Sequence, residues 1–161
     1  MIDNKKFEIL LTDNTPILNK ICRLYSNSEE DFNDYYQEVT IQLWQSFQSF
    51  RGDAQISTWV YRVAINTCLS LLRKDKRRVA TNELSHRDQI PEGDEQAAHN
   101  ERLQMLYSAI KKLKEVDRAI ILLHLEDKSY KEIAEIMGIT LSNVGVRINR
   151  IKTQLKQLIN G

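Results

Sequence analysis

The stretch SYKEIAEIMGITLSNVGVRINRIKTQLKQL, residues 129–158, carries the most informative local pattern in the chain. Ser129 and Glu132 fit a capping box, in which each side chain bonds a backbone N–H group that a helix start leaves free. Gly138 suits the left-handed position that follows a helix, because it has no Cβ to clash there. Thr140 can cap the next helix. The pattern predicts two short helices around a tight glycine turn, which is a helix-turn-helix.

The second of these helices has an apolar face and a polar face. Its apolar residues recur at spacings of three and four and predict one buried stripe, made of Val144, Ile148, Ile151, Leu155 and Leu158. Short polar and basic groups on the opposite side can enter a major groove and meet base edges and phosphates. The candidate contacts to duplex DNA are Asn143, Gly145, Val146, Arg147, Asn149, Arg150 and Thr153. An ordinary amphipathic hairpin packed in a helical bundle is the alternative interpretation.

Gly145 is unusual in this helix. Glycine inside a helix costs about 1 kcal/mol relative to alanine. A bare backbone at this position would allow close approach to DNA, so we interpret Gly145 as a functional residue.

Charge is distributed unevenly, although the net charge of the chain is only +1. Residues 1–80 carry eleven basic and ten acidic groups, residues 81–100 carry one and five, and residues 101–161 carry eleven and seven. Basic ends around an acidic middle fit two binding modules joined by a solvated tether. Residues 81–99 contain few large apolar side chains, which predicts a flexible linker.

The chain shows no sustained alternation of apolar and polar residues, so we expect no sheet. Four helices are expected on each side of the linker. In the first half they are a short helix at 7–11, a helix that begins at Pro16, a longer one after the turn at 27–30, and one at 57–73. In the second half a helix capped by Asn100 and another at 117–125 precede the helix-turn-helix.

The helix expected at 57–73 has an outer face that suits single-stranded nucleic acid. Trp59, Arg62 and Asn66 lie in line on it, where they can stack on an unpaired base, hold its phosphate and bond its edge. The run RKDKRR at 73–78 follows directly and suits a duplex backbone. A partly buried tryptophan at a helix junction and a solvated basic helix end are the structural alternatives.

Catalytic and metal-binding patterns are missing from the sequence. The three histidines show no metal-ligand spacing with the cysteines. No phosphate-binding loop, nucleophile elbow or zinc-protease motif occurs. We therefore expect no catalytic activity, no metal and no cofactor.

Cellular location is predicted from the thiols and from apolar runs. Cys22 and Cys68 lie far apart in helical apolar patterns, and buried thiols in a reducing cytosol are expected. The longest purely apolar run, residues 119–123, is too short to span a bilayer. The N-terminus lacks the apolar core of a signal peptide. These features predict a soluble cytoplasmic protein without membrane insertion.

Two segments resemble RNA polymerase sigma factors. Residues 31–77, DFNDYYQEVTIQLWQSFQSFRGDAQISTWVYRVAINTCLSLLRKDKR, resemble the second region of that family. The pairing of YYQEVTIQLW with FRGDAQISTWVYRVAIN is highly specific. Residues 101–158, which include LEDKSYKEIAEIMGITLSNVGVRINRIK, resemble the fourth region. The absence of a first-region extension and of space for a third domain is typical of the extracytoplasmic-function (ECF, group IV) sigma factors.

The resemblance implies an all-α fold of two small helical domains. Residues 1–78 would form a region 2-like domain that binds core polymerase and the minus-10 element. Residues 79–100 would form a flexible acidic linker that threads toward the RNA exit path. Residues 101–161 would form a region 4-like helix-turn-helix domain that binds the minus-35 element.

The resemblance also implies a function, which is to bind core RNA polymerase and direct promoter-specific transcription initiation. The helix with Asp34, Gln37, Glu38 and Gln42 would dock on the clamp helices of the largest polymerase subunit, and the region 4-like domain on the flap. The melted minus-10 strand, with one base flipped out, would meet Phe50, Arg51, Gly52, Asp53, Trp59, Arg62, Asn66, Arg73 and Lys74. Many relatives are held inactive by an anti-sigma factor, which becomes an expected partner beside polymerase and promoter DNA.

The sequence departs from the family pattern at two places. Many relatives have a basic residue near Gly145 and a small polar residue near Val146, so their preferred upstream element cannot be transferred to this chain. Lys114 and Asp127 stand where proline and glycine are frequent, which we interpret as tolerated loop variation.

A stand-alone helix-turn-helix repressor with a helical sensing domain is the alternative class. It would dimerise on palindromic sites, whereas a sigma factor binds two unlike elements as part of polymerase. A repressor would leave the Trp59 face and the loop at 50–55 without a role.

Overall fold

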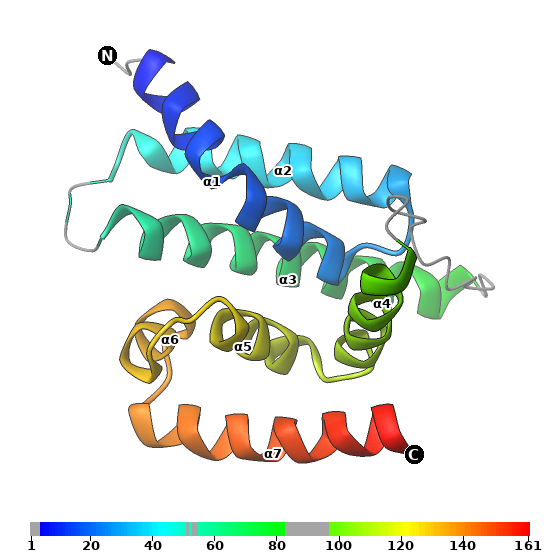
Figure 1. Cartoon of the computed structure of the whole chain (residues 1–161). Coiled ribbons are helices and arrows are strands. Elements are labelled where there is room, and N and C mark those ends of the chain that lie inside the picture. Colours follow the sequence, from blue (N-terminus) through cyan, green and yellow to red (C-terminus); the bar gives the residue numbers. More distant parts are fainter. Residues whose placement is uncertain (1–3, 51, 53–54, 83–96) are drawn as a thin grey trace. The chain divides into compact units, whose positions relative to one another are not determined.

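The computed structural model describes residues 4–50, 52, 55–82 and 97–161. This described part contains seven helices and no strand (Figure 1). The helices form two compact units, Met1–Gln89 (unit 1) and Ile90–Gly161 (unit 2). The predicted all-α fold with two helical domains is therefore confirmed. No described helix combines the length and the apolar character needed to cross a membrane.

Unit 1 is a three-helix body made of α1 (Asn4–Tyr25), α2 (Glu29–Phe47) and α3 (Ile56–Asn82). Figure 1 shows α2 and α3 side by side and antiparallel, with α1 crossing them. All three helices contribute fully buried apolar residues to the core, among them Leu18, Ile21, Val39, Leu43, Val60 and Ile65. Ser28 caps α2, because its side chain accepts a hydrogen bond from the Asp31 N–H group at 3.1 Å.

The first helix corrects the sequence-based expectation. A break at 12–15 and a new helix at Pro16 were expected, but α1 is continuous and contains Pro16. Thr12 and Thr15 donate their hydroxyl groups to carbonyls four residues earlier, at 2.8 and 2.7 Å, and Asn14 does the same with its amide at 2.8 Å. These side chains bond the helix they were expected to end. Burial of the stripe on both sides of Pro16, from Phe7 to Leu24, offsets the hydrogen bond that proline removes.

This continuity makes the described part of unit 1 a body of three helices, where four were expected. The last of them, α3, also runs further than the predicted end at 73 and reaches Asn82. The segment after 73 contains neither proline nor glycine, so nothing local stops the helix. The basic run at 73–78 is therefore helical, and its side chains project at helical spacing.

Cys22 and Cys68 meet in the core of unit 1. They come from α1 and α3, and both are completely buried and free. A hydrogen bond with the Cys22 thiol, together with burial, raises the pKa of the Cys68 thiol. The expectation of buried thiols is confirmed.

Unit 2 contains α4 (Ala97–Lys111), α5 (Glu115–Leu125), α6 (Tyr130–Met137) and α7 (Leu141–Asn160). The long helix α7 packs against the other three. Two starts differ from the expectation. A helix capped by Asn100 was expected, but α4 begins at Ala97, and α5 begins at Glu115, before the expected position 117.

The helix-turn-helix forms as predicted. The Ser129 side chain accepts from the Glu132 N–H at 3.1 Å, and the Glu132 carboxylate accepts from the Ser129 N–H at 3.3 Å. Gly138 has a φ of 68° and ends α6 in the left-handed conformation. Thr140 then caps α7 by accepting from the Asn143 N–H at 3.2 Å.

The buried stripe of α7 is shorter than predicted. Val144, Ile148 and Ile151 are completely buried and Leu155 is nearly so, but Leu158 is 40% exposed. Leu158 lies in the last turn of α7, which ends at Asn160. The stripe thus ends at Leu155.

The turn between α5 and α6 explains the departure at Asp127. Asp127 has a φ of 62°, which is the left-handed region that favours glycine. The Lys128 N–H returns to the Leu123 carbonyl at 3.1 Å, and the Asp127 N–H to the His124 carbonyl at 3.1 Å, as in a Schellman motif. Aspartate adopts this conformation more readily than most residues, so the turn forms without glycine.

Replacement of Ser129 by alanine tests the capping box. We expect a loss of about 1 kcal/mol in local stability, because the Glu132 N–H group at the start of α6 loses its acceptor, the Ser129 hydroxyl. Hydrogen exchange of the α6 amides measures this loss. Ser142→Ala is the matched control, because the Ser142 hydroxyl contacts only the Thr140 hydroxyl at 3.4 Å and caps no helix. Equal exchange in both variants would contradict the role of the box.

The charge state of Glu132 adds a pH dependence. The hydrogen bond from the Ser129 backbone lowers the pKa of Glu132. Because the pKa of Glu132 is lower in the folded state, its ionised carboxylate stabilises the fold at pH values above the ordinary glutamate pKa. This stabilisation is lost as the pH falls through the lowered pKa.

Candidate nucleic-acid interface

The outward face of α7 is the strongest candidate for contact with duplex DNA. Burial of the apolar stripe turns the opposite side of the helix to solvent, and the exposed candidates are Val146, Asn149, Arg150 and Thr153. Asn143, Gly145 and Arg147 are half-buried on the flanks. The predicted set therefore divides into an exposed group and a flanking group.

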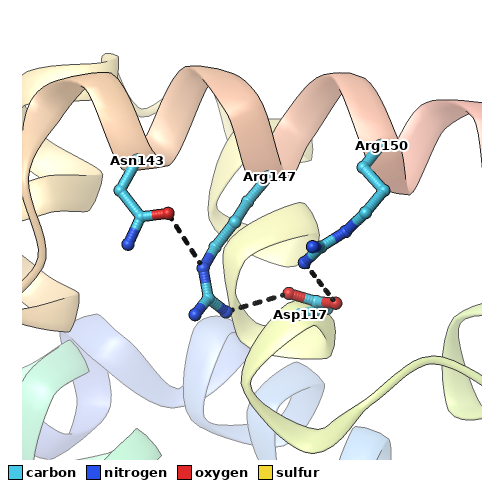
Figure 2. A network of polar contacts seen from close by, with 4 residues as sticks. All are labelled: Asp117, Asn143, Arg147 and Arg150. Atoms are coloured by element: carbon cyan, nitrogen blue, oxygen red, sulfur yellow. Dashed lines mark hydrogen bonds and ion pairs between the residues drawn. The ribbon is translucent and has the colours of Figure 1, made fainter.

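Asp117 connects two of the predicted arginines to the body of unit 2 (Figure 2). This aspartate lies on α5 and is only 2% exposed. One carboxylate oxygen accepts from Arg147 Nη1 at 3.3 Å, and the other pairs with Arg150 Nη2 at 3.5 Å. Arg147 also donates from Nε to Asn143 Oδ1 at 3.3 Å. A buried carboxylate is stable only with such partners, so the network holds both guanidinium groups.

The two arginines differ in what they can still reach. The Arg147 side chain is 30% exposed and has both its Nε and an Nη bonded within unit 2. The Arg150 side chain is 52% exposed. A guanidinium group has five N–H donors, so Arg150 keeps donors for a base or a phosphate while it is held by Asp117. Arg147 is better placed to support the surface than to read it.

Asp117 was not among the residues predicted from the sequence. The available signal was an acidic residue just before the apolar run AIILL at 119–123. A carboxylate buried beside such a run needs a basic partner. The sequence could not say that the partners lie thirty residues later on another helix.

Gly145 is not required by packing inside unit 2. A Cβ built at this position would lie 3.7 Å from the Tyr130 ring, which is an ordinary van der Waals distance. The helix therefore has room for a side chain that it does not carry. Packing therefore does not explain the glycine. We keep the interpretation that the bare backbone at Gly145 allows DNA to approach α7 closely.

In unit 1, the predicted strand-binding face of α3 is exposed at Arg62, Asn66, Arg73 and Lys74, but not fully at Trp59. Trp59 is half-buried, with its ring centroid 5.0 Å from that of Phe50 and 6.2 Å from that of Phe47. Phe47 in turn contacts Phe7, which packs edge-on against Trp44. Trp59 thus lies between Phe47 and Phe50 in an aromatic cluster and is held in place by both rings.

The loop before α3 is described only in part. Gly52 is exposed with a φ of 78°, a left-handed conformation that favours glycine. Phe50 is half-buried against Trp59. Arg51 and Asp53, which were also predicted to meet DNA, lie outside the described residues.

One hydrogen bond directs the acidic side chain within the basic run at 73–78 of α3. Asp75 is the only acidic residue in the run at 73–78, and it accepts from the buried Tyr35 hydroxyl at 2.8 Å. Burial, followed by the bond to Asp75, raises the pKa of Tyr35. The carboxylate is turned toward α2, while Arg73, Lys74 and the other basic residues of the run are exposed.

The outer face of α2 is acidic and amide-rich, as predicted for the docking helix. Asp34 and Gln37 are exposed, and Glu38 is half-buried and accepts from the Gln42 amide at 3.2 Å. A groove of about 370 Å³ lies between this face and α3. It is lined by Asp31, Asp34, Tyr35, Gln37, Glu38, Leu71, Lys74, Asp75 and Arg78. The two predicted surfaces of unit 1 therefore adjoin along this groove.

Known proteins match both units. Sigma-70 region 2 matches residues 10–78, and Sigma-70, region 4 matches residues 103–155. The ECF RNA polymerase sigma-E factor of Haemophilus influenzae is 29% identical, over 98% of this chain and 89% of its own length. The ECF RNA polymerase sigma-E factor of Escherichia coli K12 is 30% identical, over 93% and 84%.

A solved structure shares the fold. The sigma factor RpoE from Bartonella quintana, determined in complex with the anti-sigma factor NepR, has a TM-score of 0.82 and 22% identity, over 97% of this chain and 98% of that one. Two helical units with a region 2 match and a region 4 match define a sigma factor of the sigma-70 type. The chain belongs to the ECF RNA polymerase sigma factors, whose function is promoter-specific transcription initiation.

Replacement of Asp117 by asparagine tests the network. The change removes the charge that holds the two guanidinium groups but keeps the side-chain shape. We expect the preference of the holoenzyme for its upstream element over a scrambled duplex to fall by about fivefold, the equivalent of about 1 kcal/mol. Competition binding measures this ratio.

The matched control is Asp127→Asn, which makes the same charge change in unit 2 at an exposed turn. Asparagine tolerates the left-handed conformation of that position. An equal loss of preference in both variants would show that only the net charge matters and would contradict a positioning role for Asp117.

Proposed function

We propose that unit 2 reads the minus-35 duplex with α7 in the major groove. The observation that carries this proposal is the polar face of α7, which lies opposite the buried residues Val144, Ile148 and Ile151 and is preceded by a well-capped α6. The proposed contacts are Asn143, Gly145, Val146, Arg147, Asn149, Arg150 and Thr153. Within this set Arg150 and Asn149 offer donors and acceptors at the exposed surface, and Arg147 supports them through Asn143 and Asp117.

Unit 1 is proposed to capture the melted minus-10 strand. The proposed contacts are Phe50, Arg51, Gly52, Asp53, Trp59, Arg62, Asn66, Arg73 and Lys74. The rings of Phe50 and Trp59, 5.0 Å apart, support a base-stacking platform beside an exposed arginine and asparagine. Base–aromatic stacking contributes about 1–3 kcal/mol per base and helps to offset the cost of unstacking.

The acidic face of α2 is proposed to dock on core RNA polymerase. Asp34, Gln37, Glu38 and Gln42 would meet the clamp helices of the largest subunit, while the region 4-like domain rests on the flap. The carboxylates of this face repel DNA and suit a basic protein surface, which separates it from the proposed DNA-binding face of α3. The groove between α2 and α3 marks the border of the two surfaces.

The remaining assignments follow from the family. We propose domains at 1–78 and 101–161 joined by a linker at 79–100, which includes the end of α3 and the start of α4. We also propose a cytoplasmic location and a regulatory subunit without catalytic chemistry of its own. An anti-sigma factor is a proposed partner, supported by the Bartonella quintana relative, whose structure contains one. Reconstitution with core polymerase, followed by promoter-selective run-off transcription, tests the function as a whole.

Arg150→Ala tests the duplex-reading face. We expect a loss of about 1–3 kcal/mol in binding of the holoenzyme to its upstream element, because a guanidinium contact to a base or phosphate is removed. Run-off transcription from the cognate promoter should fall in parallel. Lys152→Ala, at an exposed basic position on the other flank of α7, is the control for loss of one positive charge. Unchanged promoter-specific transcription in Arg150→Ala would remove Arg150 from the interface.

Trp59→Ala tests strand capture. We expect open-complex formation to fall by the equivalent of about 1–3 kcal/mol, with little change in binding of the upstream duplex. Permanganate reactivity of unpaired thymines measures opening, and competition binding measures the duplex. Trp44→Ala is the matched control, because it removes an indole from the same aromatic cluster on the side away from Phe50. Equal losses of opening and duplex binding, or equal effects of both variants, would mean that Trp59 only supports the fold.

A further inference from the structure

Val146 is an apolar residue at the centre of a polar surface. It is 64% exposed, the highest exposure of any large hydrophobic side chain in the described part of the chain. At about 100° per residue it lies roughly opposite the buried stripe of α7, in the second turn of that helix. Recognition helices place residues of their N-terminal turns against base edges. Val146 therefore occupies the position from which a side chain points most directly into the groove.

Its neighbours lie on either side of it and leave its tip uncovered. Arg147 turns back to Asn143 and Asp117, and Arg150 also reaches toward Asp117 (Figure 2). Both guanidinium groups thus lie on one flank of α7. The side chains of Asn149 and Thr153 are exposed on the other side of Val146. The central contact of this surface is consequently apolar, with hydrogen-bonding groups around it.

A valine in a major groove has one suitable partner. It can neither donate nor accept a hydrogen bond, so contact with a phosphate or a polar base edge would remove water from that group without replacing it. The only apolar group that base pairs present in the major groove is the C5-methyl group of thymine. The branched Val146 side chain has one strongly preferred rotamer in a helix, which presents its methyl groups in a fixed position.

We propose that Val146 packs on the C5-methyl group of a thymine in the upstream promoter element and makes this sigma factor select thymine at that position. The proposal rests on the proposed placement of α7 in the major groove. It adds a specificity determinant of apolar chemistry to a surface whose other readers form hydrogen bonds.

The test uses core polymerase loaded with the full chain. Selection from a duplex library randomised over the upstream element first gives the preferred sequence. Each thymine of that sequence, on either strand, is then replaced singly by deoxyuridine, which removes the methyl group and leaves base pairing unchanged. We expect one position at which this change weakens binding by about fourfold, the effect of one buried methylene-sized group.

The variant Val146→Ala identifies the protein partner of that methyl group. In this variant thymine and deoxyuridine at the sensitive position should bind equally, with the thymine duplex weakened to the level of the deoxyuridine duplex. Leu158→Ala is the matched control, because it shortens another exposed apolar side chain of α7, in its last turn. The fourfold ratio between thymine and deoxyuridine should persist in that control.

Four results would overturn the proposal, and they are distinguishable. A preferred element without thymine, or one in which no single deoxyuridine matters, would refute the methyl contact and leave the minus-35 function intact. A thymine preference that persists in Val146→Ala would assign the methyl to another residue. A uniform loss in Val146→Ala, also on duplexes that lack the upstream element, would indicate a contact with polymerase instead. No upstream preference at all, with Arg150→Ala indistinguishable from the parent chain, would refute the proposed function itself.

Discussion

Burial of the α7 stripe is the constraint on which the DNA-reading surface depends. Val144, Ile148 and Ile151 have no exposed surface, and each buried side chain of this kind contributes about 1.5–3 kcal/mol. Rotation of α7 about its axis would expose these residues and bury the polar ones. The packing against α4, α5 and α6 therefore decides which residues face outward, and the outward face follows as a consequence of the core.

Asp117 fixes two arginine side chains of this surface by ion pairing. A carboxylate that is 2% exposed loses most of its hydration, and the loss must be balanced by close positive partners. Two arginines from α7 share this task, at 3.3 and 3.5 Å. Each is thereby restricted in its rotamers before DNA arrives, which reduces the conformational entropy lost on binding. The same network gives the two arginines different roles. Arg147 is bonded twice within unit 2 and supports the surface, whereas Arg150 remains half exposed and can contact DNA.

In unit 1, too, contacts beneath the surface orient the side chains of the proposed DNA-binding face of α3. The hydrogen bond between Tyr35 and Asp75 turns the one carboxylate of the basic run toward α2, so the exposed side of α3 is left with its basic residues. The aromatic cluster that ends at Phe50 and Trp59 fixes the rings at the start of α3. In both units a buried or half-buried partner determines how an exposed side chain is presented.

Local patterns were sufficient for the helix-turn-helix, because caps, glycine turns and apolar periodicity act over a few residues. Ser129, Gly138 and Thr140 adopt the conformations that their chemistry predicts. The same local rules failed at Pro16, where side-chain bonds and burial of the stripe on both sides outweigh the helix-breaking tendency. They also placed Leu158 in the buried stripe, although it is 40% exposed. The sequence alone determined the helical class, the two units and the family. Only the tertiary structure decided that Asp117 pairs with Arg147 and Arg150 and that Trp59 rests on Phe50, because contacts between distant segments depend on how helices pack and not on the local order of residues.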